Sequence, residues 1–483
     1  MSKSNPIPEI DNKLNYISKP SYDKHPDRLC LIARLFGLKA KLLSQNAVIL
    51  ELGCGTGSNL IPVALSNPNS SFIGVDISKE QIAIANQHVQ SLNLKNIKFI
   101  AQDLNQTEQH LWQSQTQKDF DYILVHGVFS WVPTATQDSI LQICSSQLAS
   151  NGVCYISYNV LPGFEVRNFL RHELQNKFSN LSVPTQTNLQ EIRDFLLNYN
   201  FKNKHLPFQA ARLNFEINHI LQQSDGYIFY ELLAEHNQAF YFQELTEHIK
   251  SFGLKYLGDS KLNRINYLDL NKNPEVYSDD FIETCEQEAD FCQATAFRGT
   301  LFCKNEALIN RKPNLDIIED CYLSSKLVFE SDNFGETYFY DAQGVKVSIR
   351  NKVTQEILKF VIQEWPNPRE IKSLAPLVGM TLETSVKEEL FKLFKQELLD
   401  LYLSCSTDKK PISPYVKIQL ETQDWITNYR HEYVKLTPNE IKVAKLLDAT
   451  NSLQDISKKL TPELTLNEIE DILAFFKEIA LTS

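Results

Sequence analysis

The 483-residue sequence lacks a long apolar run, paired cysteines and an excess of positive charge. No apolar stretch approaches the roughly 18 residues that a membrane-spanning helix requires, and the run from Met1 to Leu14 is polar. The nine cysteines are scattered without a C-x-x-C pair, which favours reduced thiols over a zinc site or a disulfide framework. We therefore expect a cytoplasmic protein without a signal peptide, a membrane span or a bound metal.

The charge balance and the length of the chain restrict the kind of protein and its number of domains. The chain has 48 Lys and Arg against 59 Asp and Glu, so its formal net charge is −11, whereas phosphate contacts require a basic surface. A nucleic-acid partner is therefore not expected, although a local basic groove stays open. A hydrophobic content of 43% fits a soluble globular protein, and a chain of this length divides into about two to four domains.

One glycine-rich loop dominates the pattern of the chain. An apolar run from Val48 ends at the acid Glu51, and a glycine then occupies every second position, at Gly53, Gly55 and Gly57. Such a turn lets backbone approach a ligand that side chains would block, although a tight structural turn is the alternative. A second apolar run ends at Asp76, whose carboxylate can accept both hydroxyls of a ribose. The two runs together predict a nucleoside site.

The glycine spacing selects among nucleoside cofactors. A dinucleotide fingerprint requires G-x-G-x-x-G/A, but that last slot holds Ser58 and the third glycine comes one residue early. The pattern E-x-G-x-G-x-G resembles motif I of the class I S-adenosylmethionine-dependent methyltransferases. The resemblance implies S-adenosyl-L-methionine as cofactor. The residues expected to bind it from the ends of the predicted strands are Glu51, Gly53, Cys54, Gly55, Gly57, Asn59, Asp76, Ile77, Asp103, Leu104, His126 and Gly127.

Alternating strand and helix patterns predict an α/β fold with a parallel, doubly wound sheet. The strands are expected at 48–52, 71–76, 97–103, 120–125 and 153–159, with helices at 58–66, 79–92 and 137–148 between them; Asn151-Gly152 is interpreted as the stop of the last helix. Two late strands at 253–258 and 299–304 complete a Rossmann-like, seven-stranded class I methyltransferase sheet. Ligands bind at the carboxyl ends of such strands, which gathers Glu51, Asp76, Asp103, His126 and Tyr158 around one crevice.

The segment before the first strand has two interpretations. An amphipathic helix is expected from Pro26, because proline suits a first helical turn. His25 and Arg28 then serve either for capping and surface pairing or, with Tyr22, as part of a lid that binds the cofactor. Residues 1–45 form this N-terminal lid and helix.

The remaining residues divide into an insertion and a tail. The methyltransferase core takes residues 46–164 and 239–305, and the helical insertion 165–238 serves regulation, substrate binding or dimerisation. A weak repeat of short strand, helix, short helix and longer helix predicts a mostly α, tandem winged-helix-like tail, divided at 306–405 and 406–483. Its last helix is acidic, which favours protein contact or dimerisation over DNA. We expect a cut at about Asn305 to leave cofactor binding intact.

Four further runs carry a closer resemblance: His25–Leu29, His126–Pro133, Ser157–Phe164 and Tyr241–Glu244. They resemble a bacterial methyltransferase family that has a methyltransferase regulatory domain. Its characterised members are similar to protein-lysine methyltransferases that modify outer-membrane surface proteins. The resemblance implies a protein substrate with exposed lysines, and it leaves a homodimer open.

The residues after the fourth strand restrict the chemistry. The run His126-Gly127-Val128-Phe129 contains neither the N/D-P-P-Y/F turn of amino-nucleobase methyltransferases nor the Pro-Cys of cytosine-C5 enzymes. A lysine amine, a small-molecule nucleophile or a carboxylate remains as acceptor. Phe129, Trp131, Tyr158 and Phe164 are candidate walls of an apolar acceptor channel, with ordinary core packing as the alternative. The candidate catalytic residues are His126, Trp131, Tyr158 and Asn159.

These observations favour a methyltransferase that uses S-adenosylmethionine and acts on protein lysines. A small-molecule methyltransferase is one alternative, because the same sheet serves both. A catalytically idle scaffold with a methyltransferase fold is the other, and the intact loop with Glu51 and Asp76 argues against it.

Overall fold

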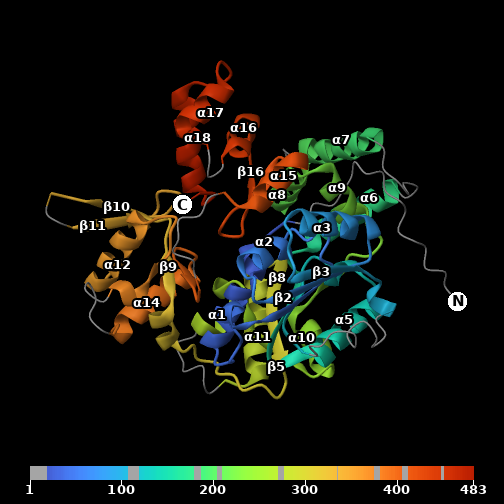
Figure 1. Cartoon of the computed structure of the whole chain (residues 1–483). Helices are drawn as coiled ribbons and strands as arrows, with labels where there is room; N and C mark the ends of the chain where they lie inside the picture. Colours follow the sequence, from blue (N-terminus) through green and yellow to red (C-terminus); the bar gives the residue numbers. More distant parts are fainter. Residues whose placement is uncertain are drawn as a thin grey trace.

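A central sheet organises the computed structural model, which describes residues 19–106, 119–178, 186–203, 209–269, 277–333, 336–374, 381–404, 412–447 and 451–482. Seven strands follow the order β3-β2-β1-β4-β5-β8-β7, and the short β6 pairs with the end of β5 (Figure 1). The strands are β1 (Val48–Leu52), β2 (Ser71–Asp76), β3 (Ile97–Ala101), β4 (Phe120–Val125), β5 (Leu148–Val160), β6 (Ala239–Phe240), β7 (Leu254–Asp259) and β8 (Phe297–Lys304). The predicted class I sheet is confirmed.

Apolar, β-branched sequence explains why the middle of this sheet is buried. Every residue of β1 is buried, as expected for a parallel strand covered on both faces. The strands from β1 to β6 pair in parallel, whereas β8 runs antiparallel between β5 and β7. Helices α2 and α3 contact β2, α5 contacts β5, and α10 contacts β7. The helices around the sheet are α1 (Pro26–Leu35), α2 (Leu60–Ser66), α3 (Lys79–Ser91), α5 (Thr134–Gln147), α10 (Phe242–Ser251) and α11 (Asp279–Gln293).

The turn signal Asn151-Gly152 was interpreted wrongly. The helix ends at Gln147, and β5 begins at once with Leu148 and runs through both residues. The pairing of β4 with β5 shifts between Phe120 and Tyr122, so the two residues lie in an irregular part of the ladder. A glycine often marks such a bulge, and a Cβ on Gly152 would lie 2.8 Å from the Leu148 side chain.

The helical insertion forms a separate cluster. It consists of α6 (Glu165–Lys177), α7 (Gln186–Asn203), α8 (Gln209–Leu221) and α9 (Asp225–Leu233). Buried leucines and isoleucines of these helices, including Leu174, Ile192 and Ile217, pack together in their own apolar core. The insertion therefore holds itself together apart from the sheet (green in Figure 1).

The tail repeats one order of elements twice. The first copy reads β12 (Lys346–Val347), α12 (Lys352–Gln363), the 3-10 helix η9 (Ile371–Leu374) and α14 (Thr384–Lys395), with β13 (Arg369–Glu370) before η9. The second reads β16 (Tyr433–Lys435), α16 (Pro438–Leu446), α17 (Leu453–Leu460) and α18 (Leu466–Glu478). The other tail elements are β9 (Tyr322–Ser324), β10 (Val328–Ser331), β11 (Thr337–Tyr340), β14 (Asp400–Tyr402), α15 (Pro414–Thr422) and β15 (Trp425–Thr427).

The two copies relate differently to the sheet. Ile357 and Leu390 of the first copy belong to the same continuous apolar core as Leu50 of β1, whereas apolar residues between 412 and 481 form a second core. The backbone N–H of Asn310 also donates to the carbonyl of Phe36, at 2.7 Å. The expected boundary at 305 therefore does not coincide with a break in the core. The other tail boundary, with Cys405, falls outside the described residues.

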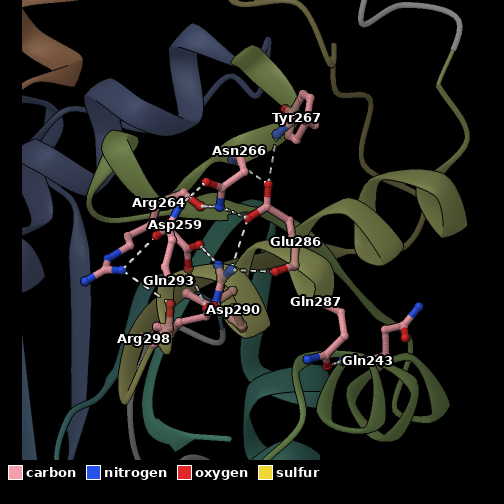
Figure 2. A network of polar contacts seen from close by, with 12 residues as sticks. Gln243, Asp259, Arg264, Asn266, Tyr267, Glu286, Gln287, Asp290, Gln293 and Arg298 are labelled. Carbon is pink, nitrogen blue, oxygen red and sulfur yellow. Dashed lines mark hydrogen bonds and ion pairs between the residues drawn. The ribbon is translucent and has the colours of Figure 1, made fainter. Parts of the chain in front are cut away.

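A buried charged network fixes the far edge of the sheet (Figure 2). Arg298 of β8 is completely buried, and its guanidinium is paired with Asp259, Glu286 and Asp290. One arginine thus faces three carboxyl groups in a site that excludes water. Burial raises the pKa of Asp259 to about 7 and also raises that of Glu286, against the pull of Arg298.

We expect Asp259→Asn to gain stability relative to the unmodified chain as the pH rises from about 4 to about 7. The folded chain keeps a proton on Asp259 that the unfolded chain releases above its ordinary, lower pKa. Folding thus binds a proton in this window, and the unmodified chain loses stability as the pH rises through it. Unfolding midpoints across this range would measure the effect, with Asp280→Asn as a control at an exposed carboxylate of α11, the helix that carries Glu286 and Asp290. A stability difference that does not change with pH would contradict the assignment.

Among the described residues, no helix is both long and apolar enough to cross a membrane.

Candidate functional site

The glycine loop joins β1 to α2 in the backbone conformation that glycine favours. Gly53, Gly55 and Gly57 have φ of 75°, 54° and 75°. The N–H groups of Gly53 and Cys54 both donate to the carbonyl of Val75, at 2.7 and 3.1 Å, and thereby fasten the loop to β2. The loop is therefore held in place from the neighbouring strand.

Two of these glycines are required by the protein itself. A Cβ on Gly53 would lie 2.2 Å from Cγ2 of Val128, and a Cβ on Gly57 would lie 2.4 Å from Cζ of Phe99. The sequence pattern led us to attribute all three glycines to the approach of a ligand. The structure adds a packing reason for the outer two, and Val128 brings the loop after β4 against the glycine loop.

Asp76 ends β2 beside the loop, and its carboxylate is oriented by two backbone groups. Oδ2 accepts from the N–H of Gly55 at 2.8 Å, and Oδ1 accepts from the N–H of Ser78 at 2.9 Å. Each carboxylate oxygen can accept a further hydrogen bond. The geometry therefore leaves capacity for the two hydroxyls of a ribose.

Glu51 lies under the loop as a buried carboxylate. Oε1 accepts from Nδ2 of Asn59 at 3.0 Å and lies 3.9 Å from Nζ of Lys24, whose side chain is 3% exposed. The other oxygen, Oε2, is buried and has no hydrogen-bond partner among the described residues. Burial raises the pKa of Glu51 to about 7 and lowers the pKa of Lys24. An orphaned buried acceptor fits the ammonium group of an amino acid, which is one end of S-adenosylmethionine.

The other end of the crevice is open, and the exposed Ile77 lies there among mostly polar residues. Ile77 follows Asp76 with 54% of its surface exposed, and it lines a shallow pocket of about 460 Å³ together with Lys79, Gln102 and Asp103. Asp103 accepts from the backbone N–H of Asn105 at 2.9 Å, which leads into a 3-10 turn that begins at Leu104. The predicted residues at the ends of β2 and β3 thus lie together, where a planar base can rest on Ile77.

His126 follows the end of β4 as a neutral imidazole. Its Nδ1 lies 3.1 Å from the Tyr155 hydroxyl, and the two rings stack with an interplanar angle of 20°. Burial, with the charge of Lys24, lowers the pKa of His126 well below its usual value. The adjacent Gly127 has φ of 66° and donates to Oγ of Ser157 at 2.9 Å. An uncharged ring here does not repel a cationic cofactor or amine.

Of the four candidate residues for the walls of the acceptor channel, three are buried and Trp131 is partly exposed. Phe129, Tyr158 and Phe164 are buried, and the Phe129 and Tyr158 rings both pack against Phe240. The Tyr158 hydroxyl lies 3.0 Å from Oγ1 of Thr300, next to the network around Arg298. These three side chains pack in the core.

Two of the candidate catalytic residues, Trp131 and Asn159, lie after the end of β4 and near the end of β5, respectively. Trp131 ends the turn after His126 and is partly exposed. Asn159 donates from Nδ2 to Oδ1 of Asn237 at 2.7 Å, and its backbone N–H donates to Oγ of Ser130. Among the four predicted catalytic residues, Tyr158 thus has its polar group, the hydroxyl, enclosed in the core.

The N-terminal segment caps α1 as expected, and its role as a lid that binds the cofactor stays a prediction. His25 caps α1, because Nδ1 accepts from the N–H of Asp27 at 3.2 Å, and burial lowers its pKa to about 4. Nε of Arg28 donates to the carbonyl of Ser260 at 2.7 Å, and the Tyr22 hydroxyl donates to the carbonyl of Leu401. Arg28 and Tyr22 thus connect the segment to the end of β7 and to the tail. The same segment places Lys24 beside Glu51.

Sequence reasoning missed two residues of the site, Lys24 and His431. Lys24 lies between Tyr22 and His25, two predicted site residues, but nothing in the sequence indicated that it is buried. His431 lies 372 positions from Asn59, yet its Nε2 is 2.7 Å from Asn59 Oδ1. No local pattern can reveal a contact of that separation. Among the described residues, no group of three or more His, Cys, Asp or Glu is arranged to hold a metal ion.

Comparisons with known proteins show the family to which the chain belongs. One family profile, described as a methyltransferase domain, matches residues 43–229, and another, described as a predicted methyltransferase regulatory domain, matches residues 224–304. RP789, an uncharacterized protein of Rickettsia prowazekii, is 30% identical over 502 residues, which cover 96% of this chain and 86% of that protein. The chain belongs to this family of S-adenosylmethionine-dependent methyltransferases.

A solved structure extends the likeness to the whole methyltransferase. PKMT2 of Rickettsia typhi, a protein lysine methyltransferase in complex with AdoHcy, shares 25% identity and a TM-score of 0.81. The match covers 97% of this chain and 100% of that one. A second Rickettsia prowazekii protein, RP028, is 34% identical over 253 residues, covering 51% of this chain and 98% of its own length.

The residues of the site fit S-adenosylmethionine, which supplies an activated methyl group when bound. Asp76 is oriented for the ribose, and Glu51 presents a free oxygen for the amino group. Ile77 is exposed beside the place of the base. The regulatory profile begins at α9 and spans β6 to β8, so it covers the late strands of the sheet and only the end of the insertion.

Proposed function

We propose that this methyltransferase transfers methyl groups to lysine side chains of protein substrates. The observation that carries the proposal is the likeness to PKMT2, a protein lysine methyltransferase, over 97% of this chain and all of that one. Many methyltransferases share the sheet, but the insertion and both tail modules are also matched. The whole architecture, and not the sheet by itself, supports the substrate class.

The chemistry of the crevice is compatible with an amine acceptor. A lysine must lose its proton before it attacks, and an apolar surrounding lowers its pKa by desolvation. Phe297 of β8 is 48% exposed and lies edge-on to the His126 ring, with the centroids 6.2 Å apart. Phe297 and Trp131 are therefore the apolar side chains that we propose for the acceptor entrance. His126 and Asn159 complete the polar side, and positioning of the nucleophile supplies most of the acceleration.

We place the enzyme in the cytoplasm of a bacterium, without a nucleic-acid substrate. The net charge of −11 and the sequence after β4 support this assignment. We also propose a homodimer through the insertion, which exposes Phe169, Leu197 and Phe215. Sedimentation of the purified chain would test the dimer, and a monomer at micromolar concentration would contradict it.

Incubation of the purified enzyme with a bacterial extract and isotope-labelled S-adenosylmethionine should label proteins on lysine. Mass spectrometry of the digested proteins would locate the label. A parallel reaction with the extract depleted of macromolecules tests the alternative, because a small-molecule methyltransferase would label the low-mass fraction. Label confined to that fraction would overturn the proposed substrate class.

A further inference from the structure

We propose that the last module of the tail completes the cofactor site, with His431 as a positioning residue that acts through Asn59 on Glu51. This inference goes beyond the methyl acceptor, because it concerns cofactor binding and holds for any acceptor. It assigns a role to a part of the chain that the sequence placed outside the catalytic core.

The module reaches the site through the tip of a hairpin. His431 lies between β15 and β16, is 4% exposed and contacts Asn59, the residue before α2. Its Nε2 is 2.7 Å from Oδ1 of Asn59, and its ring packs edge-on against His25 with the centroids 5.0 Å apart. The backbone of His431 has φ of 60°, which is costly for a residue other than glycine.

The hydrogen bonds fix the orientation of the Asn59 amide. Nδ2 of Asn59 donates to the Glu51 carboxylate, so Oδ1 faces His431 and accepts from its Nε2–H. If His431 no longer donates, the Asn59 amide can rotate. Rotation turns Oδ1 toward the Glu51 carboxylate, and these two oxygens repel each other. His431 therefore holds Asn59 as a donor to Oε1 of Glu51. Oε2 then remains free for the amino group of the cofactor.

The hairpin tip is itself tied to the rest of the tail. Arg430 is ion-paired with Asp400 and donates to the Tyr402 hydroxyl at 2.8 Å, both in the first tail module. Nδ2 of Asn428 donates to the carbonyl of Ile479 at 2.8 Å, after the last helix. A displacement of the tail would therefore withdraw His431 from Asn59. Coupling of this kind is reciprocal, so cofactor binding must also stabilise the docked tail.

Titration calorimetry with S-adenosylhomocysteine tests the proposal on the full chain. His431→Ala should raise the Kd by up to about tenfold, as expected for the loss of one hydrogen bond between neutral groups. His431→Gln retains a donor and should recover most of the affinity. Lys435→Ala removes an exposed ion pair with Asp424 on the same hairpin and should leave the Kd unchanged. An unchanged Kd for His431→Ala would overturn the proposal.

A double-mutant cycle separates positioning from general damage to the tail. If His431 acts through Asn59, His431→Ala should have no further effect on the Kd in an Asn59→Ala background. Equal effects in both backgrounds would contradict the proposal. Hydrogen exchange gives an independent readout if a variant folds poorly. S-adenosylhomocysteine should slow exchange in residues 425–435 of the unmodified chain, and unchanged exchange there would also overturn the inference.

Discussion

Asp76→Ala should weaken the binding of S-adenosylmethionine by about a hundredfold or more. The carboxylate is expected to accept two hydrogen bonds from the ribose, each contributing about 1.5–3 kcal/mol. It also accepts from the N–H groups of Gly55 and Ser78, so the substitution releases the glycine loop as well. Calorimetry would measure the effect. The expected loss of affinity is therefore larger than the loss of the two ribose hydrogen bonds by themselves.

Glu80→Ala is the matched control for this variant. Glu80 is an exposed acid four residues later and interacts with the Ser78 hydroxyl, so its removal changes the surface charge equally. Its Kd should remain within about twofold of the unmodified value. Unchanged affinity in Asp76→Ala would refute the assignment of the ribose site.

Gly53→Ala should both destabilise the chain and abolish methyl transfer. The new Cβ would lie 2.2 Å from Val128 Cγ2, and φ of 75° is unfavourable for any residue with a Cβ. Overpacking and backbone strain together should cost about 2–5 kcal/mol. Thermal unfolding and cofactor calorimetry would measure the two losses.

A second substitution distinguishes the two causes in Gly53→Ala. Val128→Ala removes the atom that the new Cβ meets, so the double variant should recover part of the stability. It should not recover all of it, because the backbone strain at residue 53 remains. A Gly53→Ala variant that is as stable and active as the unmodified chain would show that the loop tolerates side chains.

Local sequence predicted the sheet well because each strand carries its own signal. The run from Phe120 to Val125 is apolar except for Asp121 and is bounded by polar residues, and it is β4 with those limits. The acid at the end of β2 and the glycines of the loop were also found, because their chemistry is local. Asn151-Gly152 shows the limit, since the same dipeptide serves a turn or a bulge according to the pairing of the strand.

Contacts between distant segments could not be predicted. Lys24 and His431 reach Glu51 and Asn59 from opposite ends of the chain, and their roles depend on burial that only the tertiary structure creates. The contact of His431 also reverses one expectation. Removal of the residues after about Asn305 should weaken cofactor binding, and it would also expose the core that the first tail module shares with the sheet.

The surroundings of Glu51 in the proposed cofactor site thus combine three distant parts of the sequence. The loop after β1 supplies Glu51 and Asn59, the N-terminal segment supplies Lys24, and the last module supplies His431. Through His431 the tail contacts Asn59 of this site, which is the basis for the proposed link between the tail and cofactor binding.

Chemical blocking of lysines is the most direct test of the claim that the methyl acceptor is a protein lysine. A bacterial surface-protein fraction is divided, the lysines of one half are acetylated, and both halves are incubated with the enzyme and tritiated S-adenosylmethionine. We predict strong incorporation of tritium into the untreated proteins and incorporation at background level into the acetylated ones. Equal incorporation into both halves would contradict a lysine acceptor and, with it, the account of this enzyme as a protein lysine methyltransferase.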